Sequence, residues 1–357
     1  MIRFECDYGE GAHPEILKAL METNMEQAPG YSTDSHCGRA RELIRRACCS
    51  PDACVEFLVG GTQANVTVIA ACLKPYQGVL CAESGHINVH ETGALESCGY
   101  KALTLKSPQG KITAEQVREA WETHITDKSH EHMVQPGMVY LSWPTECGTL
   151  YTREELVQIS QVCREYGLKL FVDGARCGYG LAAMPQVTLK DLAELTDVFY
   201  IGGTKVGAFF GEAVVITNPE LKKDFRYYIK QHGGMLAKGR LLGIQFETLF
   251  EGAYPEGRED AFRETLYYRI SANAVRLAGK IRKAFEGCGV SMGFLSDTNQ
   301  QFPVLDQEQM EKFQEKYAFE LWQRLEDGKA VVRFCTSWAT REEDVKALTE
   351  DIFRICG

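Results

Sequence analysis

Lys205 stands in the segment FYIGGTKVGAFFG, residues 199–211, among glycines and large apolar side chains. Burial disfavours the charged form of an amine, so these surroundings predict a lowered pKa for Lys205. An uncharged amine is a nucleophile that forms a Schiff base with a carbonyl compound. The alternative is an exposed loop lysine, the common case for this residue type, and the apolar flanks argue against it. The segment therefore predicts a Schiff-base lysine.

Asp173 and Arg176 occur in the segment LKLFVDGAR, residues 168–176. The continuous apolar run is typical of a strand buried on both faces, which places Asp173 at the carboxyl end of a sheet, where open α/β sheets bind ligands. Arg176 offers a planar fork that suits a carboxylate. The alternative for Asp173 is a cap on the next turn. Lys205 follows Asp173 by 32 residues (205 − 173), enough for one helix and one strand.

The segment GGTQAN, residues 60–65, joins a predicted strand to a predicted helix. The strand is VEFLVGG, 55–61, and the helix is TQANVTVIAACL, 62–73. Backbone N–H groups at a helix N-terminus carry partial positive charge, so a Gly-Gly-Thr turn there can hold a phosphate. The alternative is a tight strand-to-helix turn without a ligand.

His86 lies in the segment ESGHINVHETGA, residues 83–94. A single histidine between strands is more often a hydrogen-bonded structural residue than a catalyst. His90 and Glu91 also allow a helical metal pair with His86, but no further ligand cluster accompanies them, so we predict no metal.

These four segments together suit one cofactor, pyridoxal 5'-phosphate (PLP). PLP requires a phosphate-binding turn, an acid facing its pyridine nitrogen, a Schiff-base lysine and a ring-stacking group, and Asp173 would hold the pyridine protonated as an electron sink. A dinucleotide is the alternative. Its support is GYGLAA, residues 178–183, which lies well beyond the strand end where a pyrophosphate turn should begin.

Strand and helix patterns alternate through the first two thirds of the chain, which predicts an α/β fold with a mostly parallel sheet and right-handed crossovers. Further predicted strands are GVLCAE (78–83), KALTL (101–105) and MVYLSW (138–143). The segment 152–167 predicts an amphipathic helix, since Thr152 and Glu155 form a capping box and Gly167 ends it.

After about residue 245 the pattern changes, and we expect a smaller α+β domain. Charged helical patterns over 259–289 and 307–327 flank short strands such as AVVRFCTSW, 330–338. The predicted organisation is an N-terminal arm (1–20), a large PLP-binding domain (21–250) and a small C-terminal domain (251–357).

Composition and charge exclude several classes of partner. The 357 residues carry a net charge of −10, which does not attract nucleic acid or anionic lipid. No apolar run approaches the roughly 20 residues of a membrane span, and the first residues are charged where a signal peptide is apolar. The 14 cysteines show no C-x-x-C spacing, so we expect buried, reduced thiols and a cytoplasmic protein.

The chain resembles the threonine aldolases, in the β-eliminating-lyase group of fold-type-I PLP enzymes, over nearly its full length. The resemblance implies a PLP-dependent transferase-like fold with a sheet of seven strands, mostly parallel. The matching residues are GTQAN (61–65), His86 with Glu91, VDGAR (172–176), Lys205, GGM (233–235), TN (298–299) and VVRF around Arg333.

The resemblance also implies roles for single residues. Lys205, His86 and Asp173 would be catalytic: Lys205 would form the Schiff base, Asp173 would pair with the pyridinium nitrogen and His86 would stack on the ring. Gly61 and Thr62 would bind the phosphate. The cofactor-binding set it implies is Gly61, Thr62, His86, Asp173, Arg176, Thr204 and Lys205.

Substrate binding is implied for Arg176 and Arg333, which would grip the α-carboxylate of an amino acid. The family usually reads Ser-Asp-Thr near its start, and this chain has Cys6-Asp7-Tyr8. The Cys6 thiol donates a weaker hydrogen bond than a hydroxyl to the same carboxylate.

The family forms homo-oligomers, so a dimer or tetramer with shared active sites is implied. Tyr31 and either Lys230 or Lys238 would then reach the cofactor of a neighbouring copy. Leu236 stands where the family has an arginine, and Trp338 lies where it often has a histidine.

The implied reaction is retro-aldol cleavage of a β-hydroxy-α-amino acid, such as threonine or allo-threonine to glycine and acetaldehyde. The substrate amine would displace Lys205, and His86, directly or through a water, would take the β-hydroxyl proton. Another PLP reaction, β-elimination or transamination, is the alternative. A third possibility is a binding protein without activity, against which the intact Asp173, Lys205, Arg176 and Arg333 argue.

Overall fold

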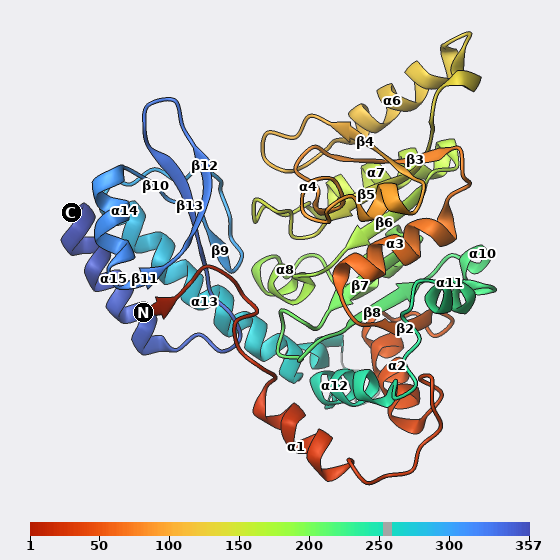
Figure 1. Ribbon diagram of the computed structural model, residues 1–357, viewed down its shortest axis with the longest axis horizontal. Helices are drawn as coiled ribbons and strands as arrows, with labels where there is room; N and C mark the ends of the chain where they lie inside the picture. Colours follow the sequence, from red (N-terminus) through yellow and green to blue (C-terminus); the bar gives the residue numbers. More distant parts are fainter. Residues whose placement is uncertain (253–258) are drawn as a thin grey trace.

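A seven-stranded sheet is the centre of the larger part of the molecule in the computed structural model, which describes residues 1–252 and 259–357 (Figure 1). The strand order is β2-β8-β7-β6-β5-β3-β4; β8 runs antiparallel to both neighbours and the other pairs are parallel. The strands are β2 Cys54–Leu58, β3 Gln77–Ala82, β4 Lys101–Leu105, β5 Gln135–Ser142, β6 Lys169–Asp173, β7 Val198–Gly202 and β8 Glu212–Ile216. The predicted sheet of seven strands, mostly parallel, is confirmed.

Helices cover both faces of this sheet. Within β6, Leu170 and Val172 enter one apolar core and Phe171 enters the other, as expected for a doubly covered strand. Helices α2, α7 and α12 pack on the first face, and α3 and α11 on the second. The helices of this part are α1 Pro14–Glu22, α2 Ser35–Ala47, α3 Gly61–Cys72, α4 His86–Val89, α5 Ala94–Ser97, α6 Ala114–Thr126, the 3-10 helix η1 His130–His132, α7 Arg153–Tyr166, α8 Cys177–Ala183, α9 Leu189–Leu195, α10 Pro219–Lys222, α11 Phe225–Gln231 and α12 Arg240–Phe250.

Helix α7 begins and ends as its sequence predicts. The Thr152 hydroxyl accepts from the Glu155 N–H, the Glu155 side chain accepts from the Thr152 N–H, and Gly167 ends the helix at φ 68°.

Among the helices of the described residues, none has the length and apolar character that a membrane span needs. All 14 cysteines lie outside disulfides. Seven are buried, six are partly buried and Cys49 is exposed, so the prediction of burial is confirmed for seven, holds in part for six and is wrong for Cys49.

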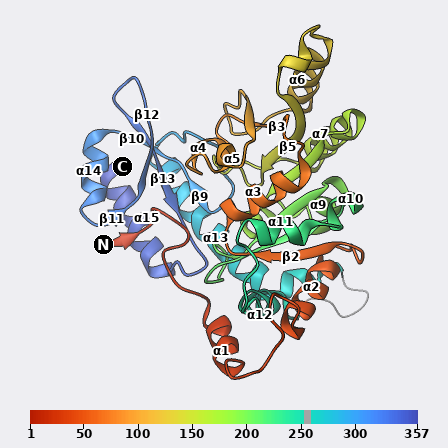
Figure 2. The same cartoon turned by 45° about the vertical axis from the view of Figure 1, so that its right-hand side comes forward.

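The smaller part contains a third apolar core, with Phe4, Leu277 and Phe334 among its members. Its sheet has the order β10-β13-β12, with β9 also pairing with β13, and β1 pairs in parallel with β11. The N-terminal segment therefore lies against this part before it crosses to α1 (Figures 1 and 2). The elements are β1 Ile2–Arg3, η2 Glu259–Glu264, α13 Leu266–Gly287, β9 Gln300–Gln301, β10 Val304–Leu305, α14 Gln307–Gln314, β11 Tyr317–Ala318, β12 Glu320–Arg324, β13 Ala330–Cys335 and α15 Glu342–Cys356.

The helical pattern predicted over 307–327 is wrong beyond Gln314. Residues 320–324 form β12 instead, paired antiparallel with the buried strand β13. Cross-strand packing outweighs the local preference of charged residues for helix, because this pairing sets Glu320 and Trp322 against Arg333. The predicted helix over 259–289 likewise begins at Leu266, after a 3-10 segment.

Candidate active site

A pocket of about 480 Å³ lies at the carboxyl ends of β3, β5, β6 and β7. Parallel strands of an open sheet end at one edge, so residues that follow different strands meet there. Most of the site residues predicted from the sequence line this pocket: Gly61, Thr62, His86, Asp173, Arg176, Thr204, Lys205 and Arg333.

Lys205 follows β7 and carries a partly buried amine. Burial and the nearby Arg176 guanidinium lower its pKa, against the opposing charges of Asp7 and Glu146. No hydrogen bond or ion pair to Nζ occurs within residues 1–252 and 259–357; the Tyr8 ring lies 5.9 Å away. The lowered pKa predicted from the apolar flanks is confirmed, and the Arg176 charge adds a cause that the segment itself does not contain.

Asp173, at the end of β6, accepts four hydrogen bonds. The hydroxyls of Tyr140 and Tyr200 each lie 2.5 Å from one of its oxygens. The Asn65 amide donates at 3.1 Å and the Ala175 N–H at 3.0 Å. The last contact is the turn cap that was the alternative for Asp173, while the two tyrosines and Asn65 fix its carboxylate at the wall of the pocket.

His86 is held by the motif partner that its sequence spacing suggests. Its Nδ1 lies 2.8 Å from Oε1 of the buried Glu91, and the Asn65 amide bonds to both Glu91 and Asp173. Burial acts to lower the pKa of His86, but the hydrogen bond to Glu91 and the charges of Glu146 and Asp173 outweigh it and raise the pKa. The described residues contain no group of three or more His, Cys, Asp or Glu side chains that could hold a metal ion, and His90 is therefore part of no such group.

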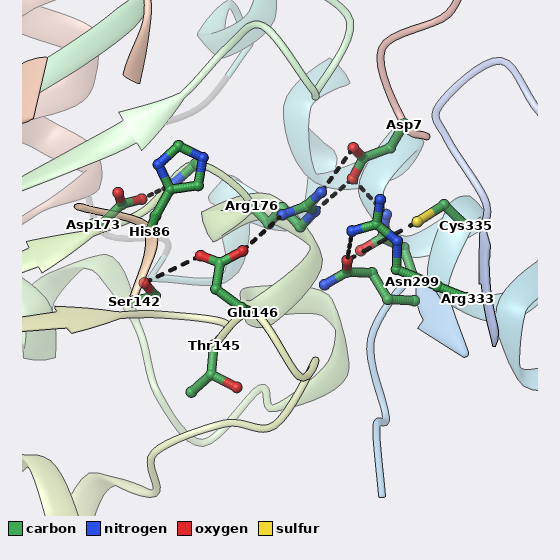
Figure 3. A network of polar contacts seen from close by, with 12 residues as sticks. Asp7, His86, Ser142, Thr145, Glu146, Asp173, Arg176, Asn299, Arg333 and Cys335 are labelled. Atoms are coloured by element: carbon green, nitrogen blue, oxygen red, sulfur yellow. Dashed lines mark hydrogen bonds and ion pairs between the residues drawn. The ribbon is translucent and has the colours of Figure 1, made fainter. Parts of the chain in front are cut away.

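Arg176 is paired with the N-terminal arm. Its Nε and Nη2 lie 2.7 and 3.1 Å from the two oxygens of Asp7, and the Asn299 amide donates to Asp7 at 2.9 Å. Burial acts to raise the pKa of Asp7, but the Arg176 and Lys205 charges lower it to about 2. Nη1 of Arg176 is left toward the pocket, 4.0 Å from Oε2 of Glu146 (Figure 3).

Arg333, on β13, is buried and stacks over Trp322. Its Nη1 donates to Gln300 at 2.9 Å, and its Nη2 donates to the Glu5 carbonyl and pairs with Glu320. Nε is a buried donor that has no partner among the described residues. An unpaired buried donor on a cation is costly, so this position suits an anion.

Two predicted residues lie elsewhere. Cys6 does not line the pocket, whereas Tyr8, two residues further along the chain, does. Burial raises the pKa of the Cys6 thiol. Trp338 lies against His13, with ring centroids 5.5 Å apart.

Tyr31, Lys230 and Lys238 are exposed and do not line the pocket. Lys230 Nζ lies 5.4 Å from the Tyr31 ring, and Tyr31 has φ 59°.

Two buried carboxyl groups were missed by sequence reasoning. Glu146 follows β5. The expectation applied to Asp173, that a polar residue after a buried strand lies at the ligand-binding edge of the sheet, would have found it. Glu212 begins β8, where no such rule applies; it accepts from the Thr204 hydroxyl at 2.7 Å and from the Gly203 N–H at 3.2 Å. Burial raises the pKa of Glu212 to about 8.

The residues present fit PLP. The partnerless Lys205 amine and the fixed Asp173 carboxylate share one pocket. At the N-terminus of α3, the cap residue Gly60 provides no side chain for the first N–H groups, which leaves them available to a phosphate. A Cβ on Gly61 would lie 3.1 Å from the Tyr200 hydroxyl that holds Asp173, so glycine keeps this turn open.

Comparison with known proteins shows similarity along the whole chain. The model of the beta-eliminating lyase family matches residues 7–317. A low specificity L-threonine aldolase of Pseudomonas aeruginosa is 32% identical over 362 residues, covering 99% of this chain and 98% of that protein. A solved threonine aldolase of Leishmania major is 40% identical with a TM-score of 0.93, covering 100% of both chains. A solved serine palmitoyltransferase of S. paucimobilis with bound PLP is 14% identical with a TM-score of 0.69. The match covers 100% of this chain and 87% of that protein, and at this identity it shows the fold alone.

Proposed function

The chain belongs to the beta-eliminating lyase family, among the threonine aldolases, and on this basis we propose that it cleaves β-hydroxy-α-amino acids with PLP as its cofactor. Threonine or allo-threonine would give glycine and acetaldehyde. The observation that carries the proposal is the Lys205 amine, which has a lowered pKa and no partner among the described residues, in one pocket with Asp173, His86 and Arg333. β-Elimination and transamination are not favoured, because the relatives bear the name of threonine aldolases.

The cofactor would be held by residues of four elements. Lys205 would bind it covalently, Asp173 would face its ring nitrogen and His86 would lie against its ring. Gly61, Thr62 and Thr204 would surround the phosphate. When bound, PLP supplies an aldehyde that takes the substrate amine and a protonated ring that draws electrons from the α-carbon.

The substrate α-carboxylate would be bound by the guanidinium groups of Arg333 and Arg176, two residues that line the pocket. Nη1 is the part of Arg176 that Asp7 does not engage. Two fixed guanidinium groups would orient the amino acid in the pocket before its Cα–Cβ bond breaks. The depressed pKa of Lys205 leaves more of its amine uncharged and ready to exchange with the substrate amine.

A homo-oligomer, dimer or tetramer, would complete the phosphate end of the site. The carboxyl group of Glu212 lines the pocket, hydrogen-bonded to the Thr204 hydroxyl. Tyr31 and either Lys230 or Lys238 of a second copy would reach the cofactor. Light scattering gives the oligomeric state of the PLP-loaded protein. If Lys230→Ala and Lys238→Ala keep the oligomeric state of the wild type, any effect of these substitutions on the cofactor is separate from assembly.

The test of the reaction is product analysis. The PLP-loaded enzyme is incubated with L-threonine, L-allo-threonine and other 3-hydroxy amino acids, and aldehyde and glycine are measured together. Equal amounts of the two products support the proposal. Pyruvate and ammonia from serine would indicate β-elimination, and a requirement for a keto acid would indicate transamination. No aldehyde from any 3-hydroxy amino acid would reject it.

A further inference from the structure

Glu146 is a carboxylate in the pocket to which the preceding roles give no task. It follows β5 in the segment SWPTECG, is 9% exposed and lines the pocket with His86 and Arg176. Figure 3 shows its carboxylate between these two side chains, with contacts to Ser142 and Arg176.

The carboxylate of Glu146 has few partners of its own. Oε1 accepts one long hydrogen bond, from the Ser142 hydroxyl at 3.3 Å. Oε2 lies 4.0 Å from Arg176 Nη1, beyond hydrogen-bond distance, and no other hydrogen bond to Glu146 occurs in the described part of the chain. Oε2 is not sealed from the pocket, since it has no hydrogen bond and yet does not belong to the fully buried unpaired atoms. A carboxylate kept this way has acceptor capacity for a donor that enters with the substrate.

His86 has one ring nitrogen engaged, since its Nδ1 is hydrogen-bonded to Glu91, and only Nε2 is left to accept a proton. Against the effect of burial, the hydrogen bond to Glu91 and the charges of Glu146 and Asp173 raise the pKa of His86, which favours the cation, in which Nε2 also carries a proton. A base must be unprotonated when the substrate arrives. The neighbouring Glu146 offers Oε2, an oxygen that accepts no hydrogen bond from the described residues.

We propose that Glu146, rather than His86, is the general base that takes the β-hydroxyl proton of the substrate. The inference rests on the proposed function and adds a catalytic residue to it. The substrate O–H bond breaks and an O–H bond forms on Oε2 of Glu146. The C–O bond becomes C=O, the Cα–Cβ bond breaks, and its electron pair stays with the α-carbon. That carbon then takes one proton from solvent to give glycine, and Glu146 returns its proton to solvent, so no oxidant or reductant is needed.

The arrangement also assigns positioning roles. Ser142 holds Oε1, which leaves Oε2 toward the pocket. Arg176 is fixed by Asp7 and presents Nη1 beside Oε2, so a substrate whose carboxylate binds Nη1 brings its β-carbon close to the base. An amino acid that lacks a β-hydroxyl gives Glu146 no proton to take.

The first test replaces Glu146 by glutamine, which keeps the shape and removes the base. We expect Glu146→Gln to lower kcat for cleavage by about 10²–10⁴-fold. PLP affinity of the apoprotein, and glycine affinity measured from the cofactor absorbance, should stay as in the wild type, since neither needs the base. Glu83→Gln is the matched control: Glu83 is an exposed glutamate after β3 outside the pocket lining, and its change should leave kcat unaltered.

The second test restores the missing carboxylate. In Glu146→Ala, added formate should recover part of the lost kcat, whereas Lys205→Ala should not respond to formate. Wild-type kcat in Glu146→Gln would overturn the proposal, and so would a fall in PLP affinity equal to the fall in rate, because that would indicate a damaged pocket. A wild-type enzyme that cleaves no 3-hydroxy amino acid would reject the proposed function, whatever the Glu146 variants do.

Discussion

The guanidinium of Arg176 and the carboxylate of Asp7 form a two-point ion pair, with Nε 2.7 Å and Nη2 3.1 Å from the two carboxylate oxygens. The residues are 169 positions apart (176 − 7), so the pair fastens the N-terminal arm to the loop after β6. The pair therefore sets which part of Arg176 is left for substrate.

Removal of one partner from this buried pair should be costly. We expect Asp7→Asn to reduce the free energy of unfolding by about 3–5 kcal/mol, because it leaves Arg176 with an uncompensated buried charge. KM for the amino acid should rise, since Nη1 would lose its fixed position. Urea unfolding and steady-state kinetics measure the two effects. Glu308→Gln is the control: it breaks the exposed pair with Lys312 and should leave the free energy of unfolding nearly unchanged.

A fall in pH should remove the stabilisation by the Asp7–Arg176 ion pair without a mutation. The pKa of Asp7 is depressed in the folded state, from 3.8 to about 2. Its stabilisation is thus complete above pH about 4 and is lost as the pH falls toward about 2. Unfolding of the apoprotein at several pH values should show this loss in the wild type and not in Asp7→Asn. Parallel curves for the two proteins would contradict the ion-pair assignment.

Glu212 should have the opposite pH dependence. Its pKa is raised in the folded state, from 4.5 to about 8, so the unfolded state binds fewer protons across that interval. Stability should therefore fall as the pH rises from about 5 to about 8. In the Glu212→Gln apoprotein this fall should be smaller, as measured by thermal unfolding at each pH. An equal decline in both proteins would show that Glu212 titrates near its ordinary pKa.

The tyrosine hydroxyls on Asp173 should matter for cofactor binding. Tyr140→Phe or Tyr200→Phe removes one of four donors, and a hydrogen bond to a charged group is worth about 1.5–3 kcal/mol. We expect PLP affinity, followed by fluorescence quenching, to fall by about 10–100-fold. Tyr100→Phe removes a hydroxyl whose bond to the Leu73 carbonyl is 3.4 Å long and should leave PLP affinity unchanged.

Lys205→Ala should abolish covalent capture of PLP. Borohydride treatment of the loaded wild type should add the cofactor mass to the peptide that contains residue 205, and the variant should gain none. Lys128→Ala, at an exposed lysine, serves as the control and should behave as the wild type. Cofactor mass on a different lysine of the borohydride-treated wild type would rule out Lys205 as the attachment site.

The sequence predicts the large sheet and the residues that follow its strands, because a buried apolar run that ends in a polar residue is a local pattern. Asp173 was found this way, and Lys205 was found from its apolar and glycine flanks. Tyr140 and Tyr200 were missed, since a tyrosine inside a strand reads as core and only the fold turns both hydroxyls toward one carboxylate. The Asp7–Arg176 pair has no local pattern at all. Strand β12 was missed because its charges favour a helix until β13 is available to pair with it.

The pairing of β1 with β11 has a consequence for how the molecule assembles. Ile2 and Tyr317 are partners across 315 positions (317 − 2), and closing so long a loop is slow in folding. During refolding from denaturant, the seven-stranded sheet can form from closer segments first, while the pocket wall that Tyr8 and Arg333 contribute is added last. Recovery of far-ultraviolet circular dichroism should therefore precede the return of enzyme turnover.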